Sequence, residues 1–197
     1  MQPEKLLEFL TVAGRLRVVP RHCRTAPDRC ESVADHSWRL ALMAYLCAEE
    51  YPGIDLGKLL TFAVIHDLGE AVTGDIPAFV KTEAQEEREA RAIDCLAAEL
   101  PEPARSRIAA LFDEYKAQSS LEAQLCLALD KLEALHSHNE ADIATWLPLE
   151  YDLQLTYGAR EAAFSPYTSQ LRAALNDATR QKIADAKINQ DTSEESI

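Results

Sequence analysis

Apolar residues recur at helical spacing along most of the chain. Over residues 3–12 and 35–51 they return every three or four positions, as on one face of an amphipathic helix. Residues 56–71 contain the run Leu-Leu-Thr-Phe-Ala-Val-Ile, which is apolar on nearly every side and predicts a central, buried helix. Further helices are expected over 82–99, 103–117, 120–139, 142–160 and 167–187. Because almost no segment alternates as a half-buried strand does, the pattern predicts one all-α domain of seven to eight helices.

Two segments fall outside this helical pattern. Residues 14–29 form an irregular stretch that holds five arginines, Arg15, Arg17, Arg21, Arg24 and Arg29. Such a stretch is either a solvated loop or a local site for an anion, and the sequence leaves both open. Residues 188–197 end in the polar string DTSEESI and are expected to form a disordered acidic tail. The domain is therefore placed at residues 1–187.

The chain is strongly acidic. Its 197 residues carry 33 Asp and Glu against 20 Lys and Arg, which gives a net charge of −13. That charge repels duplex nucleic acid and anionic membranes, so neither is expected as a partner. The odd number of cysteines, five, without a CxxC pair, is typical of thiols in a reducing cytosol. Since neither a secretory signal nor an 18-residue apolar run is visible, the expected location is the cytoplasm.

Polar residues interrupt three of the apolar helices. His66 and Asp67 follow the most apolar run, His36 lies near the start of the preceding helix, and Asp130 interrupts Leu-Ala-Leu-Asp-Lys-Leu. A buried His and a buried carboxylate are costly unless each has a partner. Adjacent helical residues point about 100° apart, so His66 and Asp67 cannot simply satisfy each other. We therefore expect the four side chains to converge on a common partner.

Two imidazoles and two carboxylates make a mixed set of nitrogen and oxygen ligands. This set suits a borderline divalent ion such as Mn, Co, Zn, Fe or Ni better than Mg or Ca. Four protein ligands leave one or two positions open for a water or a substrate oxygen when the ion is five- or six-coordinate. The sequence predicts one divalent ion per chain, held by His36, His66, Asp67 and Asp130.

Three local strings surround these residues. They are Glu-Ser-Val-Ala-Asp-His ending at His36, His-Asp-Leu-Gly-Glu-Ala-Val-Thr-Gly-Asp-Ile-Pro beginning at His66, and Leu-Asp-Lys around Asp130. In this order they resemble the HD-domain metal-dependent phosphohydrolase superfamily, in particular its 5′-deoxynucleotidase-type branch. The resemblance covers about residues 10–185. It implies an HD-domain helical bundle with a metal between the helices, commonly assembled as a homodimer.

The resemblance also implies roles for further residues. Glu70, four residues after His66, matches a Glu that lies by the attacking water and is essential to hydrolysis. Asp75 matches a second acidic residue near the substrate, and Arg21 lies where relatives bind the phosphate. Some relatives carry next to this Arg a Trp that packs near the sugar. His22 stands here instead, which leaves the preference between ribose and deoxyribose open. The implied activity is release of the 5′-phosphate from (deoxy)nucleoside monophosphates.

Three other functions remain open on the sequence. An enzyme on the same scaffold could hydrolyse another phosphoester, such as a nucleoside triphosphate or guanosine tetraphosphate. A di-iron oxygenase needs extra histidines between the HD pair and the last Asp, and residues 68–129 contain none. A metal-binding module without catalysis would keep the fold but typically loses a ligand or the Glu, and all are present here.

The other histidines and the tryptophans are assigned to structure. His136 and His138 lie two positions apart on one helix, so they cannot both face a single ion and are expected at the surface. Trp38 and Trp146 are expected to pack against neighbouring helices. Lys81 is expected to be a surface or supporting charge.

Overall fold

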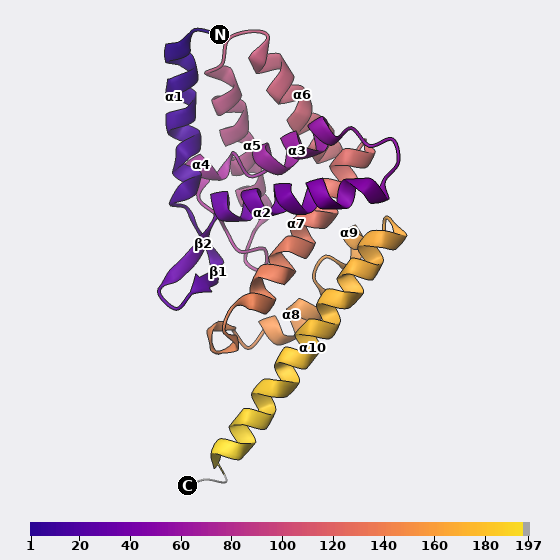
Figure 1. Ribbon diagram of the computed structural model, residues 1–197. Coiled ribbons are helices and arrows are strands. Elements are labelled where there is room, and N and C mark those ends of the chain that lie inside the picture. The colour runs from indigo at the N-terminus through magenta and orange to yellow at the C-terminus, as the bar shows by residue number, and fades with distance from the viewer. Residues whose placement is uncertain (195–197) are drawn as a thin grey trace. The chain divides into compact units, whose positions relative to one another are not determined.

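Helices make up most of the structure, a computed structural model that describes the backbone of residues 1–194 and the side chains through residue 188 (Figure 1). The longer helices are α1 (Pro3–Ala13), α2 (Val33–Cys47), α3 (Leu56–Ile65), α5 (Glu83–Ala98), α6 (Ala104–Ala117), α7 (Leu121–Glu140), α8 (Glu150–Thr156) and α10 (Pro166–Glu194). Two helices of four residues are α4 (Glu70–Thr73) and α9 (Ala159–Ala162). The eight longer helices in the described residues confirm the predicted all-α fold.

The chain divides into two compact units. The first comprises Met1–His22 and Cys30–Cys126, and the second comprises Cys23–Arg29 and the described residues from Leu127 onward. The expectation of one domain over residues 1–187 stays a prediction. Among the described residues, no helix is both long enough and apolar enough to cross a membrane.

A β-hairpin replaces the irregular stretch that the sequence predicts over residues 14–29. After the 3-10 helix η1 (Gly14–Arg17), strand β1 (Pro20–Ala26) pairs with β2 (Arg29–Ser32) in a two-stranded sheet. The Pro-Asp pair between the strands favours a turn. Because most side chains of the hairpin are polar and exposed, its strands lack the hydrophobic alternation by which a strand is recognised. The prediction of an irregular stretch was therefore wrong.

The first unit has its core where α1, α4 and α5 meet the hairpin end of α2. Five buried residues form this cluster, namely Leu16, Val33, Leu68, Ala71 and Leu96. Helices α2 and α3 also pack side by side (Figure 1). Helix α3 buries Leu59, Phe62 and Ala63 completely, whereas Val64 is 59% exposed. The apolar run therefore forms a helix with one open side rather than a fully enclosed one.

A buried carboxylate ties the start of α3 to α7. Asp55 caps α3 by accepting the N–H of Lys58, and its own N–H donates to Glu122 at 2.9 Å. The ammonium of Lys58 lies 2.7 Å from Glu122 and 2.8 Å from Glu114. Burial alone would raise the pKa of Glu122, but the hydrogen bonds from Lys58 and Asp55 outweigh it and hold the pKa at about 2. These ionic contacts fix the beginning of the helix whose other end carries His66.

In the second unit, residues 142–160 do not form the single helix that the sequence predicts. This segment forms the 3-10 helix η3 (Ile143–Thr145), then α8 and α9. The carboxylate of Asp142 accepts the N–H of Ala144 and starts η3, and Gly158 adopts φ +65° before α9. A Cβ at Gly158 would lie 2.8 Å from Cβ of Lys131, so the backbone here packs directly on α7. These local turn signals outweigh the helical spacing of the apolar residues.

Helix α10 extends further than the sequence analysis expects. It continues through Glu194, so residues 188–194 are helical where a disordered acidic tail is predicted. Residues 195–197 of that tail lie outside the described residues. Between residues 167 and 194 the chain has neither Gly nor Pro, and elongation of an existing helix adds a hydrogen bond for each residue ordered. Polarity alone therefore does not end the helix.

His138 is buried rather than at the surface. It is 7% exposed, its Nε2 lies 3.3 Å from Oε1 of Glu150, and its backbone oxygen accepts the indole N–H of Trp146 at 3.2 Å. The expectation of a surface position was wrong for His138, because a carboxylate from α8 supplies the polar partner that burial requires. His136, with 43% of its side chain exposed, lies at the surface as expected. Trp146 is buried as expected, whereas Trp38 is 67% exposed.

Candidate metal centre

The centre forms where α3 ends and the chain turns into α4. The N–H of His66 still donates to Phe62 O at 2.9 Å, and the following N–H groups of Leu68 and Glu70 bond back to Ile65 and Asp67. The sequence predicts one continuous helix over 56–71, but the chain makes a turn between the two helices. Gly69 is the weakest helix former in this turn, and a single Gly after a long apolar run is only a weak signal for a break. The turn allows the carboxylate of Asp67 to lie beside the ring of His66.

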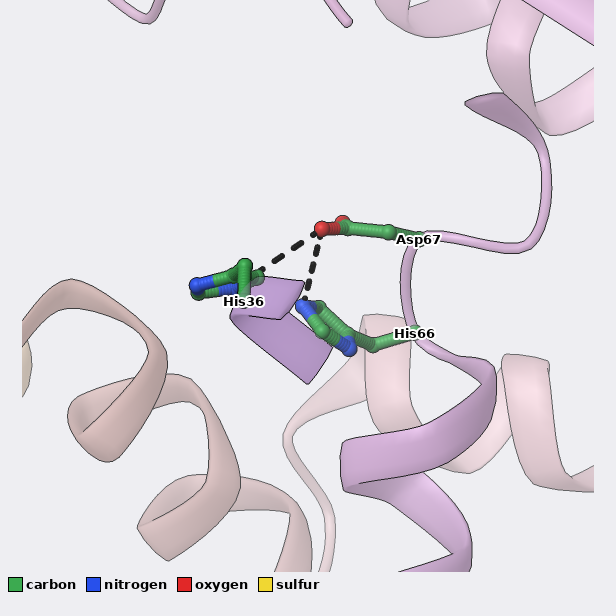
Figure 2. A group of neighbouring side chains, drawn as sticks. All are labelled: His36, His66 and Asp67. Carbon is green, nitrogen blue, oxygen red and sulfur yellow. Dashed lines mark ion pairs between the residues drawn. The ribbon is translucent and has the colours of Figure 1, made fainter. Parts of the chain in front are cut away.

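His36, His66 and Asp67 converge (Figure 2). Oδ2 of Asp67 lies 3.1 Å from Nε2 of His66 and 3.8 Å from Nε2 of His36, and the two ring centroids are 5.4 Å apart. One ligand atom from each of the three residues lies within 4.8 Å of the others. Both histidines are buried, at 0% and 6% exposure, and Asp67 is partly open. Three of the four predicted ligands are therefore brought together.

The hydrogen-bond pattern around His66 fits a cation. Its Nδ1 lies 3.1 Å from the carbonyl oxygen of Ala63, which can only accept, so Nδ1 carries the proton in the neutral ring. Nε2 then presents a lone pair toward the Asp67 carboxylate, an arrangement that repels unless positive charge lies between the two atoms. A backbone carbonyl that fixes the tautomer in this way is typical of histidines that bind metals. The donor set of two imidazoles and a carboxylate fits a divalent ion.

The start of α2 fixes His36. The hydroxyl of Ser32 accepts the N–H of Asp35 at 3.1 Å, and the Asp35 carboxylate accepts the N–H of Ser32 at 3.0 Å. This capping box holds the first turn of α2. His36 is the next residue, so its ring is positioned by a rigid helix end rather than by a loop.

Asp130 belongs to the second unit. It lies on α7, is 8% exposed, and accepts a hydrogen bond from Nζ of Lys131 at 2.8 Å. Its assignment as the fourth ligand stays a prediction.

Glu70 and Asp75 lie among the charges of the centre. Glu70 is 4% exposed, and within the described residues its Oε2 has no hydrogen-bond partner. Burial, then the charges of Asp67, Asp75 and Glu89, raises the pKa of Glu70 to about 9. Burial also raises the pKa of Asp75, against the opposing charge of Arg21. Positive charge bound beside Asp67 would favour the ionised form of Glu70, its neighbour in the cluster of carboxylates.

Arg21 extends from β1 to the same place. Its Nη1 lies 3.6 Å from Oδ2 of Asp67, and its Nε donates to Oε2 of Glu31 at 3.1 Å. The structure therefore places the predicted phosphate-binding guanidinium beside a predicted metal ligand. A cation in this position can bind an anionic ligand of the centre.

The sequence analysis assigns no role at the centre to three charged residues that lie near it, namely Glu31, Lys81 and Glu89. Glu31 pairs with Arg21, and Lys81 forms an ion pair with Glu89 of α5. Burial alone would lower the pKa of Lys81, but the contact with Glu89 raises it. Carboxylate oxygens of Asp67, Glu70 and Glu89 lie within 4.8 Å of one another. Glu31 opens the same local string as His36, whereas nothing in the charged segment 82–99 singles out Glu89.

Two glycines shape the backbone here. A Cβ at Gly69 would lie 3.0 Å from Cγ of Glu89 and 3.1 Å from its backbone oxygen, so the missing side chain allows α5 to approach the turn. Gly74 has φ +77° and ψ 159°, a conformation that is essentially restricted to glycine. This bend directs the chain into Asp75.

Comparison with known proteins defines the class of this fold and centre. A solved structure, described as a predicted metal-dependent phosphohydrolase from Magnetospirillum magnetotacticum, is similar with a TM-score of 0.76 and 28% identity, over 91% of this chain and 95% of that one. Bovine 5′-deoxynucleotidase HDDC2 is 36% identical over 139 residues, which are 68% of this chain and 67% of that protein. The Schizosaccharomyces pombe 5′-deoxynucleotidase hdd1 is 30% identical over 138 residues, 66% of this chain and 69% of that one. The fold and centre are those of a phosphohydrolase that uses a divalent metal.

The family model of the HD domain matches residues 13–172. The chain belongs to the HD domain family. The match includes every residue that the sequence analysis assigns to the metal, the phosphate or catalysis.

Proposed function

We propose that this enzyme removes the 5′-phosphate from (deoxy)nucleoside monophosphates and releases nucleoside and phosphate. The observation that carries the proposal is the convergence of His36, His66 and Asp67 with a buried Glu70 and the guanidinium of Arg21. Relatives with the name 5′-deoxynucleotidase support the choice of substrate. Water attacks phosphorus, the bond from phosphorus to the 5′ oxygen breaks, and one proton must move from the water to the leaving oxygen.

Each residue has one task in this reaction. Glu70 orients the water and accepts its proton. Arg21 binds the phosphate oxygens and offsets their charge. Asp75 supplies the proton that the leaving 5′ oxygen takes up, directly or through water.

We propose one divalent ion per chain, held by His36, His66, Asp67 and Asp130. An ion bound there supplies Lewis acidity and lowers the pKa of water. The two imidazoles favour Mn, Co, Zn, Fe or Ni over Mg, which prefers oxygen ligands alone.

The nucleoside has a candidate contact next to Arg21. The ring of His22 lies edge-on to Phe79, with ring centroids 5.6 Å apart and planes at 84°. A ring pair beside the phosphate-binding residue can contact the sugar or base of a nucleotide.

A substrate panel tests the proposed function. Protein stripped with chelator and reloaded with Mn, Co, Zn or Mg should release phosphate from ribo- and deoxynucleoside 5′-monophosphates. Triphosphates and guanosine tetraphosphate should react far more slowly. The reverse order would establish the alternative, an HD-scaffold hydrolase of those substrates. If no substrate reacts although each chain binds an ion, the protein is a metal-binding module.

We also propose that two copies pair through one face of α2. Trp38, Leu42, Tyr45 and Leu46 recur at helical spacing and are 67%, 44%, 56% and 64% exposed. Together they expose on the order of 500 Å² of apolar surface, at the upper end for a monomer. Self-pairing would bury twice that area, about 1,000 Å², which is the lower bound for a specific interface.

The face is also complementary to itself. A hollow of about 340 Å³ adjoins it, lined by Tyr45, Leu46, Ala48, Glu49 and Leu56. A two-fold axis at Leu42 places Trp38 of one copy opposite position 46 of its partner, and therefore at this hollow. The four side chains of the face are uncharged, and Glu49 is the one charged residue among those that line the hollow.

Light scattering measures the pairing. The wild type should have twice the chain mass of 21.9 kDa at micromolar concentration, and the variant with Trp38→Ser and Leu46→Ser should have the chain mass. Leu7→Ser, an equally exposed position on α1, is the control and should leave the pair intact. A monomeric wild type, or a paired double variant, would contradict the assignment.

We propose a cytoplasmic location. All five cysteines are thiols, which supports a reducing compartment.

A further inference from the structure

Glu31 is a buried carboxylate outside the ligand set. It lies on β2 with only 2% of its surface exposed, where an unpaired carboxylate would be costly. Its two oxygens face two guanidinium groups. Arg21 Nε donates to Oε2 at 3.1 Å, and Arg39 Nη2 lies 3.6 Å from Oε1. One carboxylate therefore contacts an arginine from β1 and another from α2.

Of the two arginines, Arg21 extends to the metal centre. Its Nη1 lies 3.6 Å from Oδ2 of Asp67, the same oxygen that faces both imidazoles (Figure 2). A guanidinium is planar, so the bond from Nε to Glu31 fixes the direction of both Nη groups. Asp67 is a second carboxylate within reach. A guanidinium released from Glu31 can therefore turn further toward Asp67 than the present 3.6 Å contact of Nη1 and away from a phosphate.

We propose that Glu31 is the positioning residue of Arg21 for the phosphoryl group. The inference rests on the proposed function, in which Arg21 binds the substrate phosphate. Glu31 holds Nε at 3.1 Å, limits Arg21 to the single 3.6 Å contact of Nη1 with Asp67, and leaves the Nη groups directed at the centre.

Titration of the manganese-loaded protein with inorganic phosphate tests this role without turnover. Glu31→Gln keeps the shape but removes the charge, and Arg21→Ala removes the guanidinium. Each variant should weaken phosphate binding by about tenfold, as expected for loss of a charge-assisted hydrogen bond. The double variant should bind no more weakly than Arg21→Ala alone, because Glu31 acts through Arg21. In turnover, Glu31→Gln should raise KM by about tenfold and change kcat by less than about threefold.

Arg39→Ala is the matched control, since it removes the other partner of the same carboxylate. The effect of Glu31→Gln should persist in that background. Metal content and the thermal midpoint are measured for every variant. Unchanged phosphate affinity in Glu31→Gln, or losses that multiply in the double variant, would show that Glu31 merely supports the fold.

A second variant keeps the test decisive if Glu31→Gln does not fold. Arg21→Lys retains Glu31 and the positive charge but lacks the planar guanidinium with its several N–H donors. It should therefore also weaken phosphate binding by about tenfold. Unchanged affinity there would overturn the proposal. The two proposals can fail separately. The substrate panel measures turnover of nucleotides, whereas the phosphate titration measures the coupling between Glu31 and Arg21 even in a protein that turns over no nucleotide.

Discussion

Replacement of Glu70 by Gln is expected to lower kcat for phosphate release by about 10³-fold, within the range of general acid–base catalysis. Each chain should still retain its divalent ion. Gln has nearly the same shape as Glu but cannot take a proton from water. In the structure the Glu70 side chain is buried, and Oε2 has no hydrogen-bond partner within the described residues. That oxygen is available to a water in the centre. The measurement pairs kcat with the metal content of the same sample.

Glu86→Gln is the control for this experiment. Glu86 is exposed on α5, the helix that carries Glu89, and its loss should change kcat by less than about twofold because an exposed charge contributes little. Loss of the metal together with the activity in Glu70→Gln would identify Glu70 as a ligand. A variant that keeps more than about a tenth of the wild-type rate would exclude it as the base.

Asp67→Ala is expected to abolish both metal retention and activity. Oδ2 of Asp67 lies 3.1 Å from Nε2 of His66 and 3.8 Å from Nε2 of His36. Its removal leaves two neutral imidazoles, and the affinity for the ion should fall by at least about 100-fold, more than for loss of a supporting residue. Competition with a chelator gives the affinity, and phosphate release gives the rate.

Asp113→Ala is the control, because it removes a carboxylate that lies outside the centre. Asp113 is exposed on α6, so this variant should bind metal and turn over substrate like the wild type. Circular dichroism checks that Asp67→Ala retains its helices. An Asp67→Ala protein with an unchanged rate would remove Asp67 from the ligand set and with it the proposed mechanism.

The convergence of three residues in the first unit was predictable because its signal is local. His36, His66 and Asp67 interrupt apolar helices, and a polar interruption in such a helix requires a partner. The same holds for the capping box before His36, which involves residues only three positions apart. Glu70 lies four positions after His66, so either a helix or a turn over these residues keeps the two side chains near each other.

The hairpin and the supporting charges were not predictable from local pattern. The strands are mostly polar, so they form through pairing with each other rather than through a buried face. Contacts such as Glu31 with Arg39 or Lys81 with Glu89 join segments that meet only in the folded chain. The turn after His66 was missed because the apolar run before it favours a continuing helix, and a single Gly only weakly opposes this.

Gly69 implies a dependence between two positions that are far apart in the sequence. A Cβ there would lie 3.0 Å from Cγ1 of Ile93 as well as against Glu89, so α5 would have to move by a few tenths of an ångström to admit it. Substitutions at 69 and 93 are therefore not independent during evolution. A lineage that acquires Ala at 69 gains helix propensity in the turn, yet the added Cβ meets both Glu89 and Ile93, and a smaller residue 93 relieves one of these two contacts. The two positions should change together among relatives of this enzyme.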